Sequence, residues 1–418
     1  MNVIRQLNAD GKILFATRML RLFGYGFLSV IMALYLAQVG LTQTQIGLLL
    51  TLTLLGDTAV SLYITTTADR IGRRRMLMIG ALLMVFASIV FASTRNFYLL
   101  VFAAFLGVIS PSGNEVGPFL SIEQASLTLL IPGSERTRVF AWYNLVGSFA
   151  TATGALVSGG LSSLLQNGGM SALNSYRVVV IGYGLVGLGL IVLFTRLSQA
   201  IEVTPAPQAA AAEGQPDPGS FLGLHGSQRI VFQLAGLFTL DAFAGGLVVQ
   251  SLVAYWFQIK FGVDPAVLGS IFFGANILAG ISALSAAWVA QRIGLINTMV
   301  ATHLPSNILL ILVPLMPTLP LAIAMLLLRF SISQMDVPTR QSYTMAVVKP
   351  EERSAASGIT GVARTVGASL SPVITGAFLA NPALLGLPFI LSGGLKIVYD
   401  LLLYFNMRRV RPPEEQAG

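Results

Sequence analysis

The sequence predicts an all-α integral membrane protein with twelve transmembrane helices in two similar six-helix bundles. Hydrophobic residues make up 55% of the 418 positions, charged residues make up only 10%, and the mean hydropathy is +0.77. A soluble domain could not cover that much apolar surface with so few polar residues. Long apolar stretches alternate with short polar loops, and a charged turn returns about half a chain later with most of its charge removed.

A helix needs about 20 apolar residues to cross a hydrocarbon core of roughly 30 Å. Twelve stretches of the chain meet that requirement. They cover residues 13–37, 46–67, 76–93, 97–116, 139–161, 178–195, 230–257, 266–290, 298–316, 320–343, 355–380 and 384–405. We therefore expect an N-terminal bundle over 1–195, a linker over 196–228 and a C-terminal bundle with a short tail over 229–418.

The distribution of basic residues predicts the orientation. Sixteen of the 25 lysines and arginines lie at the termini, in the linker or in the loops on the same side of the membrane. Only Arg95, Arg177 and Lys260 lie in loops on the other side. The positive-inside rule therefore places both termini and the linker on the cytoplasmic side of the cell membrane. The N-terminus lacks the pattern of a cleaved signal peptide, so we expect it to be retained.

The second half repeats features of the first. The segment 68–72, ADRIG, returns as AQRIG at 290–294, a shift of 222 residues. Gln124, Glu135, Arg136 and Gly159 return with a shift of 217 as Gln341, Glu352, Arg353 and Gly376. A parallel repeat of six helices relates two halves by an axis along the membrane normal, and substrate sites in such folds lie between the halves.

The charged turn resembles the loop signature of the major facilitator superfamily, G-x-x-x-D-R-x-G-R-R/K. Residues 65–75, TTTADRIGRRR, keep this pattern except for Thr65 in place of the first glycine. Residues 154–159, GALVSG, resemble a degraded form of the G-P-x-x-G-G pattern of proton-driven drug and multidrug exporters, and Pro372 and Gly376 keep part of it in the eleventh span. The resemblance implies a secondary transporter that works by alternating access.

The resemblance also implies a cytoplasmic gate in this turn. Its residues would be Asp69, Arg70, Gly72, Arg73 and Arg74. Asp69 would meet the N-terminus of the eleventh helix near residues 354–357, where the helix dipole favours an anion. Arg73 would meet Glu123 or Glu135. The alternative is that the arginines only fix the topology. Asp69 distinguishes a gate from a purely topological role of the arginines, because topology does not require an acid there.

Twelve ionisable residues lie within or at the rims of the predicted spans, where each is costly unless it is paired or faces water. They are Asp57, Glu115, Glu123, Asp241, Asp336, Asp400, Arg18, Arg21, Arg329, Arg340, Arg364 and Lys396. Eight of them lie in spans 1, 4, 7 and 10 or their extensions. In the superfamily that the chain resembles, these helices line the central cavity, which supports the same assignment here.

Arg18, Arg21 and Tyr25 share one face of the first predicted helix, and we expect Arg21 and Tyr25 to line the cavity. The internal repeat places Arg21 opposite Asp241. This arrangement suggests an ion pair that forms or breaks as the halves move, or alternatively a static structural pair. Arg18 can instead extend its charge to the headgroups.

The tenth span carries Arg329, Ser333, Asp336 and Arg340 along one polar stripe, with Pro338 favouring a kink near Asp336. The corresponding run 110–115, SPSGNE, predicts a broken fourth helix around a cavity. The proton-coupling candidates are Asp241, Asp336, Glu115 and Asp57, because burial raises the pKa of a carboxyl group while a nearby arginine opposes that shift. Glu115, Glu123 and Arg340 can instead lie at the cytoplasmic rim.

Other polar residues suggest structural roles. Lys396 and Asp400 are four residues apart and predict a self-neutralising pair on an outer helix. His303 is read as structural. With no cysteine and two histidines, a metal site is not expected, and neither is a disulfide or a cofactor.

The sequence therefore predicts a monomeric secondary transporter in the lipid bilayer, most simply an exporter of small amphipathic compounds driven by proton entry. A second hypothesis is a uniporter or symporter for a small organic anion, supported by Arg21 and Arg329. A third is a non-transporting receptor or lipid scramblase on the same scaffold. The +8 net charge does not indicate nucleic-acid binding, since the basic residues lie in short loops. No nucleotide or nucleophile motif indicates an enzyme.

Overall fold

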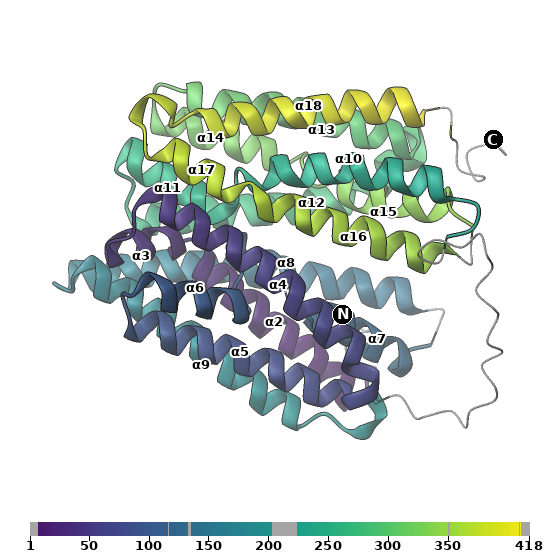
Figure 1. Ribbon diagram of the computed structural model, residues 1–418, viewed down its shortest axis with the longest axis horizontal. Coiled ribbons are helices and arrows are strands. Elements are labelled where there is room, and N and C mark those ends of the chain that lie inside the picture. Colours follow the sequence, from purple (N-terminus) through teal and green to yellow (C-terminus); the bar gives the residue numbers. More distant parts are fainter. Residues whose placement is uncertain are drawn as a thin grey trace. The chain divides into compact units, whose positions relative to one another are not determined.

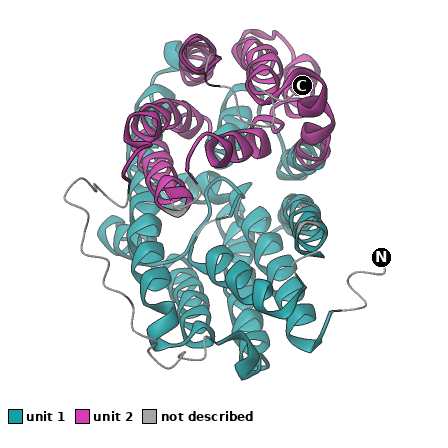
Figure 2. Ribbon diagram, turned by 90° about the vertical axis from the view of Figure 1, so that its right-hand side faces the viewer, with its two compact units in different colours: residues 1–203, 249–277, 372–385 teal, residues 204–248, 278–371, 386–418 magenta. Residues whose placement is uncertain are grey.

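The computed structural model describes residues 7–115, 117–132, 135–202, 224–349, 352–408 and 410, and every regular element in that part is a helix. The chain forms two compact units (Figures 1 and 2). Unit 1 contains residues 1–203, 249–277 and 372–385, and unit 2 contains 204–248, 278–371 and 386–418. Unit 1 thus includes two segments of the second sequence half, so the units do not coincide with the bundles predicted over 1–195 and 229–418.

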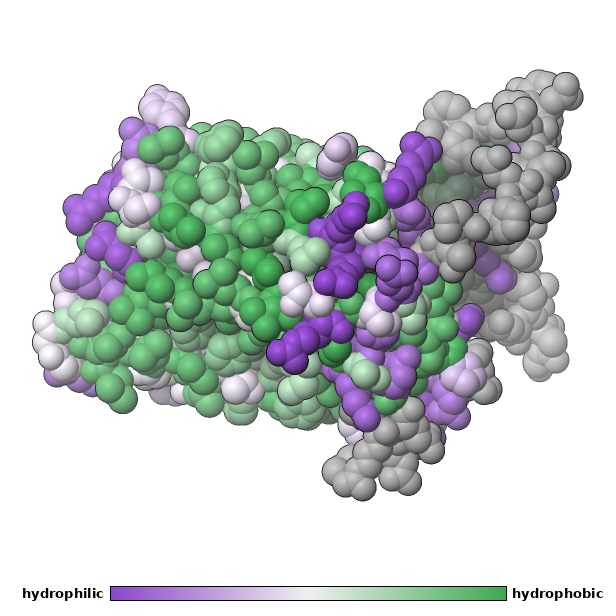
Figure 3. Space-filling view, turned by 90° about the horizontal axis from the view of Figure 1, so that it is seen from below, coloured by the Kyte–Doolittle hydropathy of each residue, from purple (hydrophilic) through white to green (hydrophobic). Residues whose placement is uncertain are grey.

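The described residues include nine helical stretches long and apolar enough to cross a membrane, or ten if the bent pair α2 (Ala9–Ser29) and α3 (Met32–Val39) counts as one. These stretches contain α4 (Gln43–Ile71), α5 (Arg73–Ser93), α8 (Arg136–Asn167), α9 (Ala172–Thr195), α10 (Gln228–Gly246), α11 (Gln250–Phe261), α12 (Pro265–Ile293), α13 (Leu295–Leu312), η3 (Val313–Leu315), α16 (Arg353–Leu370), α17 (Pro372–Leu379), η5 (Pro382–Leu384) and α18 (Leu387–Met407). Hydrophobic side chains cover most of the face in Figure 3, with hydrophilic ones toward its ends. The all-helical, multi-pass membrane fold is confirmed.

Two predicted spans are broken. In the fourth, α6 (Phe97–Leu106) and α7 (Phe119–Leu130) flank an irregular stretch, as the run 110–115 predicts. In the tenth, α14 (Leu319–Phe330) and α15 (Asp336–Ala346) flank residues 331–335. Pro338 lies in the first turn of α15, where its missing N–H costs no helical hydrogen bond. The count of twelve spans, which needs each of these pairs to act as one span, stays a prediction.

Glycine makes the repeated charged turn possible. Gly72 joins α4 to α5 with φ of +114°, and Gly294 joins α12 to α13 with φ of +81°. These angles are unfavourable for any residue with a Cβ atom. The two glycines are related by the 222-residue shift, so the repeat read from the sequence is also a repeat of backbone conformation.

Within unit 1, α2 packs on α8 and α9, and α5 lies alongside α9 (Figure 1). Segments of the second sequence half join this unit through two close glycine contacts. A Cβ on Gly376 would lie 2.9 Å from Cα of Gly47, and one on Gly159 would lie 2.8 Å from Cα of Gly269. The internal repeat relates the two contacts, because Gly47 corresponds to Gly269 with the shift of 222 residues and Gly159 corresponds to Gly376 with the shift of 217. Small residues allow membrane helices to approach this closely.

Two glutamates hold the two ends of the predicted linker to neighbouring helices. Glu202 accepts hydrogen bonds from N–H of Arg73 (2.7 Å) and Arg74 (3.1 Å) at the N-terminus of α5. In unit 2, Glu352 accepts from the N–H groups of residues 225–227 at 2.5–3.0 Å. Hydrogen bonds from the Ser227 side chain and these N–H groups lower the pKa of Glu352 to about 2. Residues 196–202, predicted as linker, include η2 (Gln199–Ile201) with Ile201 buried; residues 203–223 lie outside the described part.

We expect Gly159→Val to separate α8 from α12, because a Cβ there would lie 2.2 Å from the carbonyl oxygen of Pro265. The adjacent Gly160 has nothing within 4 Å of its Cβ position, so Gly160→Val is a matched control. The chain has no cysteine, so a Ser163→Cys/Ala266→Cys pair reports this contact. Oxidative cross-linking should slow about tenfold in Gly159→Val and stay unchanged in Gly160→Val. Equal rates in both variants would contradict the contact.

Candidate functional site

Unit 1 contains a buried ionic network centred on Arg21. Nη1 and Nη2 of Arg21 donate to the two carboxylate oxygens of Glu123, each at 2.7 Å, and Nε donates to Glu115 at 2.8 Å. The Arg21 and Glu123 side chains have no solvent exposure. Glu123 also accepts hydrogen bonds from the hydroxyl groups of Thr17 and Tyr143. Bidentate arginine–carboxylate pairs are among the strongest hydrogen bonds that proteins make.

Arg18 completes this network, one helical turn from Arg21. Its Nη1 donates to the second oxygen of Glu115 at 2.8 Å, and its Nε donates to the carbonyl oxygen of Tyr143 at 2.8 Å. Glu115 therefore bridges both arginines. It comes from the irregular stretch between α6 and α7, and its side chain is 16% exposed, more than any of its ion-pair partners. Two arginines and two glutamates balance in charge, and Glu115 is the acid that water can reach.

Asp57, on α4, is a further buried acid of unit 1. Its Oδ1 has no hydrogen-bond partner among the described residues. Across the described ranges, no ion pair includes Asp57. A buried carboxylate without a cation is costly as an anion. Tyr25, the third residue of the predicted stripe, is fully buried on α2.

Unit 2 contains a second network, in which three cations surround Asp241 of α10. One carboxylate oxygen accepts from Lys396 Nζ of α18 at 2.5 Å. The other accepts from Nη1 of Arg340 on α15 at 3.2 Å and from Nη1 of Arg364 on α16 at 3.1 Å. Arg340 also binds Asp336 at 2.8 Å. Four helices therefore meet around one buried carboxylate, which these charges stabilise as an anion.

His303 and Asp400 extend the network of unit 2. His303 Nδ1 lies 2.8 Å from Asp400 Oδ1, and its Nε2 lies 3.9 Å from Asp241. The amide of Asn307, one turn along α13, donates to the other oxygen of Asp400 at 2.9 Å. The imidazole thus lies between two acids. Within the described ranges, no group of three or more His, Cys, Asp or Glu residues is placed to hold a metal ion.

Arg329 is a basic residue of unit 2 whose guanidinium carbon lies 5.0 Å from the centre of the Phe330 ring. It lies near the end of α14, directly before the break, and it is half-buried. Its Nε is shielded from solvent and has no hydrogen-bond partner in the described part of the chain, as is true of the Ser333 hydroxyl one turn further on. No carboxylate among the described residues forms an ion pair with Arg329. The network therefore has four permanent cations, Arg329, Arg340, Arg364 and Lys396, for three aspartates.

Several contacts in this structure differ from those expected from the sequence. Glu115 and Glu123 occupy all three nitrogens of Arg21, and three cations occupy Asp241, so each has its partners within its own unit. An Arg21–Asp241 pair that forms as the halves move stays a prediction. Glu123 is buried rather than at a rim, and so is Arg340. Lys396 and Asp400 do not pair with each other, because each contacts a different neighbouring helix.

The predicted gate turn has different partners as well. Arg73 binds neither Glu123 nor Glu135; its Nε donates to Asp69 at 2.8 Å, and its Nη1 donates to the carbonyl oxygen of Ile201. Arg74 donates to the carbonyl oxygen of Leu197. The Asp69 side chain is 62% exposed. Its predicted contact with the start of the eleventh helix stays a prediction.

Sequence reasoning missed His303, Asn307 and Lys396 as members of one network. A usable signal was present, because His303 and Asn307 are four residues apart on one apolar helix, as are Lys396 and Asp400 on another. Polar residues at this spacing share a helix face. Two such faces in one membrane domain are expected to meet, since neither can face lipid at low cost.

The profile of the Major Facilitator Superfamily matches residues 14–372 and, in a second match, residues 234–418. The chain belongs to this superfamily. It is 32% identical to the uncharacterized membrane protein YJR124C of Saccharomyces cerevisiae, over 94% of this chain and 93% of that protein. The superfamily assignment and the transporter structures that the chain resembles point to a transporter rather than an enzyme.

Solved structures of the superfamily share the fold at low sequence identity. The nucleoside transporter NupG matches with a TM-score of 0.74 and 13% identity, over 94% of this chain and 99% of that one. The D-xylose–proton symporter gives 0.71 and 15%, over 96% and 98%. A bacterial homolog of the human lysosomal transporter Spinster, inward-facing and unoccupied, gives 0.69 and 16%, over 96% and 97%. These matches support the superfamily fold and carry no substrate to this chain.

We expect Glu123→Gln to destabilise this superfamily member by about 3–5 kcal/mol, because it leaves the buried Arg21 without half of its countercharge. A matched control is Glu135→Gln. The Glu135 side chain is exposed, and its carboxylate lies 3.9 Å from Arg138, at the limit of an ion pair. Melting of the purified protein in detergent, followed by intrinsic fluorescence, measures both variants. A melting temperature of Glu123→Gln equal to that of the control would contradict the structural importance of the pair.

Proposed function

We propose that the chain is a proton-coupled secondary transporter of small amphipathic compounds that works by alternating access in the cell membrane, with both termini cytoplasmic. The observation that carries this proposal is Glu115, a partly exposed carboxylate that bridges Arg18 and Arg21 at a break in a membrane helix. Non-helical backbone at membrane depth is tolerated where it lines a cavity. A proton that reaches Glu115 would remove one of the two negative charges that hold these arginines.

The contacts change the order of the coupling candidates. Asp241 and Asp336 are less accessible to water than Glu115, because their side chains are 4% and 8% exposed against 16% for Glu115. Glu115 and Asp57 become the first candidates, Glu115 because water can reach it and Asp57 because no cation pairs with it in the described structure. Asp241 and Asp336 then organise the basic side chains of unit 2.

Two further features support this mechanism. The glycine contacts Gly47–Gly376 and Gly159–Gly269 are close and related by the internal repeat, as contacts that close a transporter and separate during its cycle would be. Export rather than import is supported by residues 154–159, which resemble the exporter motif and include Gly159. The gate residues Asp69, Arg70, Gly72, Arg73 and Arg74 would act at the other end of these helices.

We expect Glu115→Gln to uncouple transport from the proton gradient. Glutamine keeps the size and hydrogen-bonding capacity of the side chain but cannot gain or lose a proton at this position. In proteoliposomes, gradient-driven accumulation of a compound identified by thermal-shift screening should fall about tenfold or more, equivalent to at least about 1.4 kcal/mol. Exchange without a gradient should stay near the wild-type rate, as should both activities in Glu135→Gln. Unchanged gradient dependence in Glu115→Gln would contradict the proposal.

A second candidate, transport of small organic anions, is favoured by the charge excess in unit 2. Four permanent cations face three aspartates, and Arg329 offers an unpartnered Nε beside the unpartnered Ser333 hydroxyl. A guanidinium group binds a carboxylate in a planar, two-pronged arrangement. Arg21 no longer supports this candidate, because its nitrogens are already bound to glutamates.

If unit 2 binds an anionic group, Arg329→Gln should raise KM for carboxylate substrates by about tenfold to a hundredfold, the usual cost of a lost charged hydrogen bond. Its melting temperature should stay equal or rise, because the substitution removes a half-buried cation that has no ion pair among the described residues. Arg292→Gln, at an exposed arginine stacked on Trp288, is the control. A lower melting temperature with an unchanged KM would show that Arg329 is structural.

A further inference from the structure

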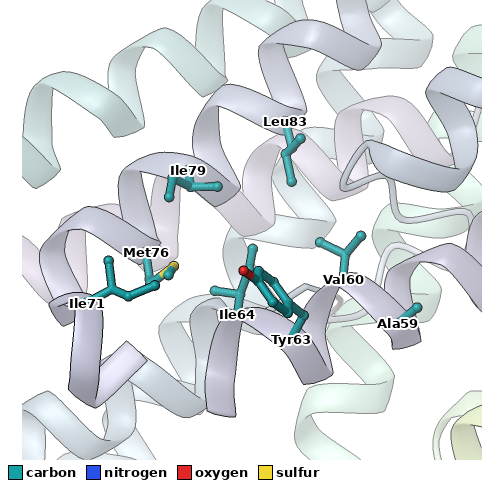
Figure 4. A pocket seen from close by; sticks show the side chains of 8 residues that line it. All are labelled: Ala59, Val60, Tyr63, Ile64, Ile71, Met76, Ile79 and Leu83. Carbon is teal, nitrogen blue, oxygen red and sulfur yellow. The ribbon is translucent and has the colours of Figure 1, made fainter. Parts of the chain in front are cut away.

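A crevice of about 450 Å³ opens between α4 and α5, the two helices joined by the Gly72 turn (Figure 4). Side chains from both helices point into it. They are Ala59, Val60, Tyr63, Ile64, Ile71, Met76, Ile79 and Leu83. This volume falls within the range of about 300–1,000 Å³ typical of small-molecule sites. Tyr63 is 66% exposed and Ile71 is 42% exposed, so the crevice is open at the surface of unit 1.

Two exposed arginines are sequence neighbours of the residues that line the crevice nearest the turn. These lining residues are Ile71 and Met76, and their neighbours are Arg70 and Arg75. Neither arginine forms an ion pair with any described residue. The acids nearby are already engaged, because Asp69 binds Arg73, and Glu202 accepts from the N–H groups at the start of α5. Two arginines without an ion pair among the described residues therefore directly precede two lining residues of the apolar crevice.

We propose that this crevice and Arg70 and Arg75 form a binding site for one anionic glycerophospholipid. An acyl chain would lie between α4 and α5, and the phosphate group would bind the two arginines. A hydrocarbon chain gains little by leaving the bilayer for the crevice, since both are apolar. The crevice therefore positions the lipid, and the headgroup charge provides the selectivity, through the affinity of arginine for phosphate.

Apart from Arg70, which also belongs to the proposed gate, this site is separate from the residues of the proposed transport mechanism. No residue of either ionic network lines the crevice, so the proposal depends neither on proton coupling nor on the transported compound. It also differs from an ordinary lipid-facing groove. A boundary lipid held only by its chains would not distinguish anionic from zwitterionic headgroups, whereas a site with two unpaired arginines must.

Native mass spectrometry of the full-length protein tests the site with phosphatidylglycerol and phosphatidylcholine of identical acyl chains. We expect one phosphatidylglycerol to be retained in preference to phosphatidylcholine. Retention should weaken about tenfold or more in Arg70→Gln/Arg75→Gln, because both headgroup contacts are lost. Val60→Phe, which fills the crevice and leaves both arginines, should weaken it comparably.

The control is Arg138→Gln/Arg292→Gln, which removes two exposed basic side chains elsewhere and should keep wild-type retention. Equal retention of the two lipids, or equal losses in the control, would overturn the proposal. Retention that depends on the arginines but not on Val60→Phe would also overturn it, since this would indicate a charged surface without a chain site. The same spectra would reveal a dimer, and a dimer lost in Val60→Phe would assign the crevice to a second copy. Unchanged melting temperatures in detergent exclude misfolding of the variants.

Discussion

The pairing of Arg21 with two glutamates is the interaction on which the architecture of unit 1 depends. An arginine without solvent exposure, in a chain that spans a bilayer, requires countercharge from other helices. Glu123 supplies it from α7, and Glu115 supplies it from the irregular stretch between α6 and α7. The break in the fourth span thus brings backbone and a carboxylate into reach of α2. The same pairing explains why Glu115, which also binds Arg18, is the more accessible acid.

The two units pair their buried charges differently. In unit 1 two arginines balance two glutamates. In the proposed mechanism, one proton on Glu115 removes a negative charge and allows Arg18 and Arg21 to change partners. In unit 2 three cations converge on Asp241, Asp400 is held by His303 and Asn307, and Arg329 has no ion pair in the described part of that unit. This difference is the reason that we propose proton uptake in unit 1 and, as the second candidate function, binding of an anionic group in unit 2. This division requires no contact between the networks, in contrast to the Arg21–Asp241 pair expected from the sequence.

The sequence predicted features that depend on local chemistry. The Gly72 and Gly294 turns follow from the repeated pentapeptide, the break in the fourth span follows from residues 110–115, and the membrane class follows from composition. Partners across helices were not predictable in the same way. The spacing of Lys396 and Asp400 places both on one helix face but does not say which helices lie against that face. Glu202 was missed because it belongs to a segment whose composition indicates a linker, although it binds the start of α5.

Simultaneous measurement of proton and substrate movement tests the central claim most directly. Proteoliposomes that contain the wild-type protein and an internal pH-sensitive dye, with no imposed gradient, would be given a compound that raises the melting temperature of the protein. The account predicts that entry of the compound moves protons in the opposite direction, and that Glu115→Gln abolishes the dye response while exchange of the compound continues. Substrate flux without any proton movement in the wild-type protein would contradict it.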